Sequence, residues 1–327
     1  MDEDVLSELR ELSKIEEVIE FIKPFYPELN VQNYTIEEIE VELNRIFVKI
    51  VGKIISFSPG NMRAFLKDYL LHFEIKNIKQ IILGSIMGWS KDDKSKNINY
   101  LAEEYLENID FIKGLLDKPS LDDIRVYMEG TMYNKAIREG ILYFRNYNET
   151  FVLEAFLDQL YYVKLKNRKK FLSKKEKKII ALFIDIMIEV YNLNMIYRGI
   201  LNNIDKNLLS QFLIDNYLFL DENKLRNLLN QEDINHFFFV IENYFNNVEG
   251  IKELYHKIGI KKEHFYWSIE GLYTNYFFTK FKAIIEDIDY STILRIVEVL
   301  MKKEKEIQFV ILPNIINIIH EKYNRLR

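Results

Sequence analysis

The side chains most regularly placed for chemistry are two carboxylate–amide pairs. Glu74 precedes Asn77 by three residues in EIKNIKQIILG, and Glu189 precedes Asn192 by three in EVYNLNMIYRG, at an offset of 115 residues (189 − 74). Carboxylates serve as acids, bases and metal ligands, but acid–base catalysis needs a second titratable partner in reach. Each pair offers only an amide instead, so we interpret the repeated motif as structural.

The motif predicts a corner between two helices. An asparagine is a poor residue inside a helix and a good N-cap, because its side chain competes for backbone hydrogen bonds. Gly84 and Gly199 follow the two asparagines by seven residues, where a left-handed residue would end a short helix. We therefore expect a long helix, a bend capped by Asn77 or Asn192, a two-turn helix and a stop.

Other catalytic or metal-binding patterns are weak. Asp122 and Asp123 begin an aspartate-rich stretch, but Val126 stands where the next magnesium-binding acid would be needed. His256 and His264 are eight residues apart with a glycine between them, and no phosphate loop or zinc-binding HExxH motif occurs. We assign no catalytic, metal-binding or cofactor-binding residue, and we expect no enzyme and no cofactor.

Composition restricts the class of protein further. The 327 residues carry a formal charge of −5, which disfavours a dedicated nucleic-acid binder, and the chain has no cysteine, which fits a reducing compartment. The acidic start MDEDVLSELR differs from a signal peptide, and no uncharged apolar run reaches the roughly 20 residues of a spanning helix. We expect a protein that reaches a membrane only through a partner.

Hydrophobic spacing indicates an all-α fold. Apolar residues recur at three and four positions, while prolines and glycines are few. Capping-box patterns predict helix starts at three places: Thr35–Glu38, Ser120–Asp123 and Ser173–Glu176.

The repeat divides the chain into three similar helical units of about a hundred residues. We expect them at 1–110, 111–225 and 226–327, with boundaries placed to within about ten residues. A third copy of the motif falls near Glu306, but Phe309 replaces the asparagine and Pro313 follows, so this copy is degenerate.

One basic stretch joins two of the expected helices. KLKNRKKFLSKKEKK (164–178) is most simply a solvated hairpin tip, and the alternative is contact with lipid headgroups or an acidic partner. The residues we single out for that contact are Lys169, Lys170, Lys174 and Lys175.

These motifs together resemble the C-subunit family of A/V-type ATPases (ATP synthases), whose vacuolar homologue is the d subunit. The family's repeated signature is of the type E-x-D-x-x-N-[IL]-x-x-[IL]-x-R, although the central acid is missing here. The second copy matches it at Glu189, Asn192, Leu193, Ile196 and Arg198, and the first at Glu74, Asn77, Ile78 and Ile81, with Leu83 in place of the arginine. FVLEAFLDQLYYVKL (151–165) and KEKEI (303–307) resemble two further family stretches.

The resemblance implies a funnel of three similar helical units around a pseudo-threefold axis. It implies a non-catalytic central-stalk subunit that couples the membrane rotor ring to the central axle, in an ATPase or ATP synthase that transports protons or sodium ions. Partners would be the proteolipid ring and the axle, at the cytoplasmic face of the membrane, with no nucleic acid and no small-molecule substrate. The alternative is a free-standing cytosolic helical adaptor.

Overall fold

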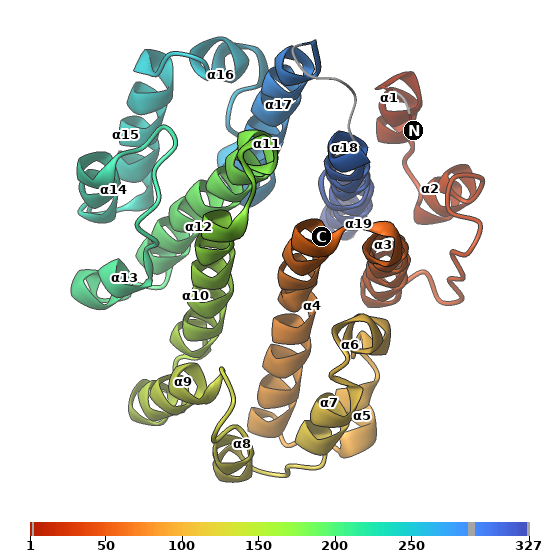
Figure 1. Cartoon of the computed structure of the whole chain (residues 1–327), viewed down its shortest axis with the longest axis vertical. Helices are drawn as coiled ribbons and strands as arrows, with labels where there is room; N and C mark the ends of the chain where they lie inside the picture. The colour runs from red at the N-terminus through yellow and green to blue at the C-terminus, as the bar shows by residue number, and fades with distance from the viewer. Residues whose placement is uncertain (2, 287–291, 326–327) are drawn as a thin grey trace.

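A computed structural model of the chain describes residues 1, 3–286 and 292–325, and every regular element in them is a helix (Figure 1). The all-α prediction is therefore confirmed for the described residues. The N-terminal third contains α1 (Glu3–Glu11), α2 (Ile15–Ile22), α3 (Ile36–Phe57), α4 (Gly60–Ile86), α5 (Lys91–Ser95), α6 (Tyr100–Leu106) and α7 (Ile109–Leu116).

The rest of the chain continues the pattern of long helices joined to shorter ones. The middle third contains α8 (Leu121–Tyr127), α9 (Asn134–Tyr147), α10 (Thr150–Arg168), η1 (Lys169–Phe171), α11 (Lys174–Glu176), η2 (Lys177–Ala181), α12 (Leu182–Leu201), α13 (Lys206–Phe212) and α14 (Glu222–Leu229). The last third contains α15 (Ile234–Asn247), α16 (Lys252–Ile258), η3 (Lys262–His264), α17 (Phe265–Glu286), α18 (Thr292–Glu304), η4 (Lys305–Ile311) and α19 (Leu312–Arg325). The expected unit boundaries at 110 and 225 fall inside α7 and α14.

The three predicted helix starts are present. Thr35, Ser120 and Ser173 each accept a hydrogen bond from the backbone amide three residues later, at the first turns of α3, α8 and α11. Only Ser173 forms the full reciprocal box with Glu176. The carboxylate of Glu38 instead accepts from the amides of Gln32 and Asn33, 2.8 Å from each, and so orders the loop before α3.

The predicted corner at the repeated motif is wrong. Helices α4 and α12 run straight through Asn77 and Asn192, and Gly84 and Gly199 lie inside these helices without the left-handed conformation. Both asparagines are buried, so tertiary partners satisfy the amides that we assigned to capping. Those partners outweigh the low helix propensity of asparagine.

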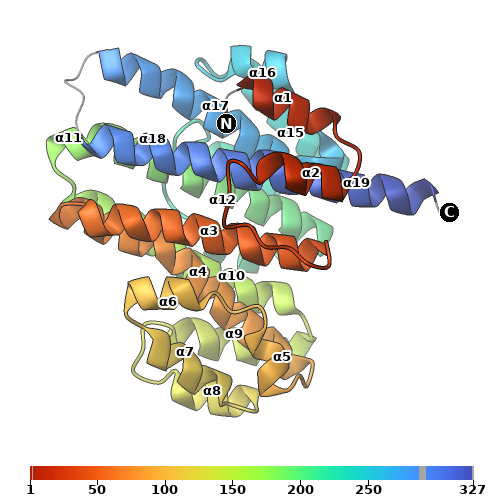
Figure 2. The same cartoon turned by 90° about the vertical axis from the view of Figure 1, so that its right-hand side faces the viewer.

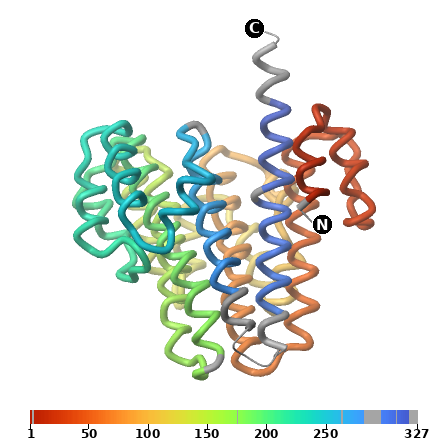
Figure 3. The backbone as a smooth tube through the Cα atoms, turned by 90° about the horizontal axis from the view of Figure 1, so that it is seen from above, coloured from red at the N-terminus to blue at the C-terminus, as the bar shows by residue number. Residues whose placement is uncertain are grey.

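The long helices pair into hairpins that pack around one shared interior. Contacts join α3 with α4, α10 with α4 and α12, and α12 with α17. The connections α3–α4 and α10–α11 lie at the same end of the molecule, while α19 extends from the opposite end (Figures 2 and 3). The short helices cover the outside of the hairpins (Figure 1).

One helical stretch, Lys177–Leu201, is long and apolar enough to cross a membrane by length and composition. Within the protein, 78% of its most apolar window is buried, which is the behaviour of a core helix.

Candidate functional site

The first motif pair, Glu74 and Asn77, holds a segment that returns alongside α4. The Asn77 amide pairs with the backbone of Asn99 in both directions: its Oδ1 accepts from the Asn99 amide at 2.9 Å, and its Nδ2 donates to the Asn99 carbonyl at 3.2 Å. Asn108 Nδ2 donates to Glu74 at 2.6 Å. We call residues 99–108 the first return segment.

The second motif pair, Glu189 and Asn192, repeats this arrangement on α12. Asn192 Oδ1 accepts from the amide of Ile214 at 2.8 Å, and its Nδ2 donates to the Ile214 carbonyl at 2.9 Å. In both copies the backbone partner lies 22 residues after the asparagine. The motif therefore anchors a return segment, here residues 214–220, instead of capping a bend.

The two glycines of the motif allow the short helix that follows to pack closely against the long helix. A Cβ atom on Gly199 would lie 2.2 Å from Leu209 Cδ2, and one on Gly84 would lie 2.5 Å from Lys94 Cγ. Each contact residue follows its glycine by ten positions. A larger side chain would push α13 or α5 away. Glycine is therefore required at these positions because the neighbouring helix packs so closely.

A second carboxyl group accompanies Glu74. Glu103 is fully buried beside it and accepts a hydrogen bond from Asn77 Nδ2 at 2.6 Å. Burial, followed by the charge of Glu74, raises the pKa of Glu103 to about 9. Glu103 therefore carries its proton at neutral pH.

Glu189 is held by backbone donors instead. The amides of Leu218, Phe219 and Leu220 donate to its carboxylate over 2.7–3.1 Å. Burial raises the pKa of Glu189, and these amides together with the Tyr273 hydroxyl oppose the rise. Such a nest of amides stabilises a buried carboxylate.

All three repeat glutamates accept a hydrogen bond from a tyrosine far away in the sequence. Tyr133 donates to Glu74, Tyr273 donates to Glu189 at 2.7 Å, and Tyr26 donates to Glu306 at 2.6 Å. Burial opposes ionisation of Glu306, but Lys303, the Met1 amino group and Tyr26 together lower its pKa. The degenerate third copy thus keeps its glutamate–tyrosine contact.

The remaining predicted site residues are scattered. Arg198 lies 3.7 Å from Glu154 and stacks over Phe151 at 4.7 Å. Lys169 turns inward to Asp185 and Asn216, so it is unavailable to a partner, whereas Lys170 and Lys174 are exposed. The side chain of Lys175 lies outside the described residues.

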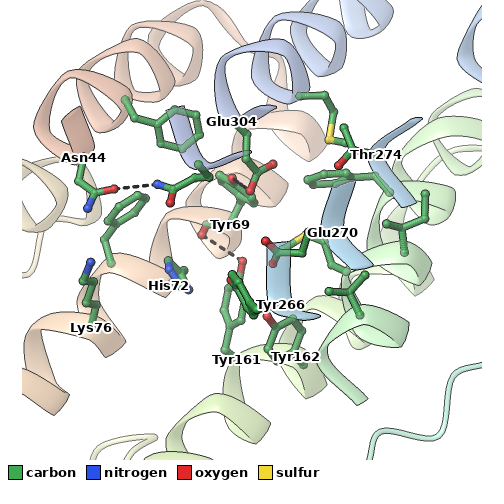
Figure 4. A pocket seen from close by; sticks show the side chains of 18 residues that line it. Asn44, Tyr69, His72, Lys76, Tyr161, Tyr162, Tyr266, Glu270, Thr274 and Glu304 are labelled. Carbon is green, nitrogen blue, oxygen red and sulfur yellow. Dashed lines mark hydrogen bonds between the residues drawn. The ribbon is translucent and has the colours of Figure 1, made fainter. Parts of the chain in front are cut away.

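A central hollow lies between the hairpins, and sequence analysis did not predict it. Its inner part, about 130 Å³, is lined by two long helices from each third of the chain (Figure 4). An adjoining wider part of about 830 Å³ shares His72, Lys76, Tyr266 and Gln308 with it. Tyr266 exposes 51% of its surface, and Figure 4 shows it lining this space.

The inner hollow combines aromatic rings with two carboxyl groups. Burial raises the pKa of Glu304 to about 7, opposed by the hydroxyl of Tyr69, which donates to it at 2.8 Å. Burial also raises the pKa of Glu270, and it lowers that of His72 to about 4, with Lys76 adding to the effect. An unpaired buried carboxyl gains most from a cation placed beside it.

A sequence signal for Glu270 did exist. It is the one carboxylate in FYWSIEGLYTNYFFTKF (265–281), a stretch otherwise dominated by aromatic and apolar residues. Glu304 lies in the charged stretch KKEKE, which carries no such signal. In the part of the chain that the structure describes, no group of three or more His, Asp or Glu side chains is placed to hold a metal ion.

Comparison with known proteins settles the family. The sequence profile of the family described as ATP synthase (C/AC39) subunit matches residues 1–326. The chain belongs to this family. It is 26% identical over 183 residues to the C subunit of the A-type ATP synthase from Pyrococcus furiosus, covering 56% of this chain and 47% of that protein. It is 27% identical over 221 residues to the corresponding C subunit from Methanocaldococcus jannaschii, covering 65% and 53%.

The chain thus spans about half the length of the curated relatives it matches. Membership of the family confirms the resemblance found in the sequence.

Proposed function

We propose that this chain is a non-catalytic central-stalk subunit that couples a membrane rotor ring to a central axle. The observation that carries the proposal is the central hollow, a concave space enclosed by two long helices from each third of the chain in a member of the ATP synthase (C/AC39) subunit family. The wider part of the hollow, about 830 Å³, has room for about one turn at the end of a helical partner, and the inner part, about 130 Å³, has room for a single side chain. The complex would couple ATP synthesis or hydrolysis to transport of protons or sodium ions.

The glutamate–tyrosine contacts support a closed arrangement of three units. With units at 1–110, 111–225 and 226–327, Glu74 of the first accepts from Tyr133 of the second, and Glu189 of the second accepts from Tyr273 of the third. Glu306 of the third then accepts from Tyr26 of the first, which closes the cycle. We propose on this basis a pseudo-threefold funnel around the hollow.

The acidic lining suggests which chemistry the axle brings. Glu270 and Glu304 face the hollow among tyrosine rings, as Figure 4 shows. A lysine or arginine from an inserted helix would pair with these carboxyls and stack on the rings. The ring would lie on the other side of the protein, at the cytoplasmic face of the membrane.

The test is binding of the purified chain to the isolated axle protein and to the detergent-solubilised rotor ring. We expect one chain per ring and one per axle. Tyr266→Arg places a bulky cation in the hollow and should weaken axle binding about tenfold or more while leaving ring binding unchanged. Tyr147→Arg, on an exposed site of α9, is the matched control and should bind both partners normally.

The binding results test the site of the axle separately from the coupling function itself. Unchanged axle binding by Tyr266→Arg would place the axle elsewhere on the protein. Failure of the folded chain to bind either partner would leave the free-standing helical adaptor as the function to pursue.

A further inference from the structure

Two hairpin tips present a phenylalanine to solvent at matching positions. Phe57 ends α3 and exposes 86% of its surface, and Phe171 ends η1 and exposes 66%. They are 114 residues apart (171 − 57), one less than the offset of the repeated motif. Single exposed apolar residues are ordinary, but the same residue exposed at the same place in two repeats calls for a partner.

The sequence stretches that contain the two phenylalanines are rich in basic residues. Residues 43–67 contain five lysines and arginines and no aspartate or glutamate, and residues 159–175 contain seven and none. Seven of these twelve cations, Arg168 with Asp68 among them, pair with acids outside the two stretches. Among the described residues, Arg63, Lys170 and Lys174 are exposed and form no ion pair.

Both tips lie at one end of the molecule. The α3–α4 and α10–α11 connections are at the left in Figure 2 and at the bottom in Figure 3. The guanidinium of Arg168 lies 5.8 Å from the ring of Phe171, while its charge is paired with Asp68. The connection between α17 and α18, residues 287–291, lies outside the described residues.

Exposed aromatic rings beside uncompensated cations suit the boundary of an anionic bilayer. The cations attract lipid phosphates within a Debye length, and the rings enter the boundary between headgroups and acyl chains. An acidic protein surface would use the cations but would leave the two phenylalanines without an apolar environment. We infer that the end of the molecule formed by Phe57, Arg63, Lys170, Phe171 and Lys174 contacts an anionic lipid surface directly.

This contact goes beyond the proposed coupling function, in which the protein ring is the only link to the membrane. It also requires a local surface, because the whole chain has a formal charge of −5 and is repelled on average by an anionic bilayer. Binding to lipid would therefore depend on these particular side chains.

The test is flotation of the purified chain with vesicles, comparing pure phosphatidylcholine with a mixture containing phosphatidylglycerol. We expect binding to the anionic vesicles only, lost at high salt as exposed charges are screened. Phe57→Ser with Phe171→Ser should weaken binding about tenfold through lost apolar burial. Lys170→Gln and Lys174→Gln should each weaken it about fivefold.

Matched controls lie on the outside of the last third of the chain. Phe239→Ser removes a phenylalanine that exposes 73% of its surface on α15, and Lys257→Gln removes an exposed lysine on α16. Both should bind vesicles like the unmodified chain. Equal loss in the controls and the tip variants would overturn the inference.

Two further results would also overturn it. One is no binding to anionic vesicles by the folded chain. The other is a tip variant that binds vesicles normally but fails to bind the solubilised ring, which would assign the tips to a protein contact. Because the ring and axle assays are separate, failure of lipid binding leaves the coupling proposal standing.

Discussion

The two motif pairs perform the same task with different chemistry. Asn77 and Asn192 pair with backbone 22 residues later in the same way, but the neighbouring glutamates have different donors. Glu74 accepts from the side chains of Asn108 and Tyr133 and lies beside the protonated Glu103. Glu189 accepts from three consecutive backbone amides and a tyrosine.

The difference shows that the asparagine of the motif has a fixed geometry, whereas the hydrogen-bond donors to the glutamate can vary. The asparagine must both donate and accept at a fixed distance, a requirement that no other uncharged side chain of its length meets. The glutamate needs only enough donors, and the chain supplies them either from side chains or from backbone. Replacements should therefore have unequal effects at the two glutamates and similar effects at the two asparagines.

The largest contrast is expected at the glutamates. Glu189→Gln should lower the free energy of unfolding by about 1–3 kcal/mol, because one of the two accepting oxygens is replaced by an NH₂ group, which cannot accept from the backbone amides or from Tyr273. Glu74→Gln should cost only about 1 kcal/mol, because its side-chain partners can rearrange. Urea titrations of both variants measure this, and equal losses would end the distinction between the two sites.

A smaller contrast in the loss of stability is expected on replacing the two asparagines. Asn192→Ala leaves the amide and carbonyl of Ile214 unpaired in the interior and should cost about 2–4 kcal/mol. Asn77→Ala should cost nearly as much, about 1–3 kcal/mol, because it leaves the partly exposed backbone of Asn99 and the buried carboxyl of Glu103 without their partner. Chemical denaturation measures both losses, with Asn202→Ala, at an exposed position after α12, as the control. A loss confined to one asparagine would contradict the shared role.

An experiment that varies the pH tests whether Glu103, the neighbour of Glu74, is protonated in the folded protein. Folding raises the pKa of Glu103 from about 4.5 to about 9, so the folded state keeps a proton that the unfolded state releases. The free energy of unfolding therefore falls as pH rises between these values. Glu103→Gln keeps the neutral form and should stabilise the protein by about 1–3 kcal/mol at pH 8, and less at pH 5.

Thermal melts of that variant across pH provide the measurement. The same substitution should leave the second return segment intact, as seen in hydrogen exchange of the Leu218–Leu220 amides. A variant as pH-dependent as the unmodified chain would show that Glu103 is not the protonated group.

The smallest effects are expected at the glycines. Gly199→Ala should cost about 1–2 kcal/mol, since the crowding against buried Leu209 exceeds the gain in helix propensity. Gly84→Ala should cost less, about 0.5–1 kcal/mol, because the crowded atom belongs to an unbranched lysine stem, which is buried but adjusts more easily than the branched end of Leu209. Differential scanning calorimetry resolves the two, and a larger loss at Gly84 would reverse the order we predict.

Sequence patterns predicted the elements better than their joints. Hydrophobic spacing indicated the all-α class, and Ser120 and Ser173 marked helix starts because capping depends on residues only three positions apart. The corner at Asn77 and Asn192 was wrong for the opposite reason. Local propensity favoured a cap, whereas partners 22 residues away satisfied both amides inside a continuous helix.

What the sequence by itself determined is the class of the protein: helices with buried apolar faces, a motif written twice, and membership of a family that the motif already indicated. Only the tertiary structure decided what the motif holds, which tyrosine meets each glutamate, and that Glu270 and Glu304 face one hollow. The physical reason is the sequence separation over which each interaction acts. Helix formation and capping act over a few residues, whereas hydrogen bonds between return segments, helices and hairpins depend on how the chain packs.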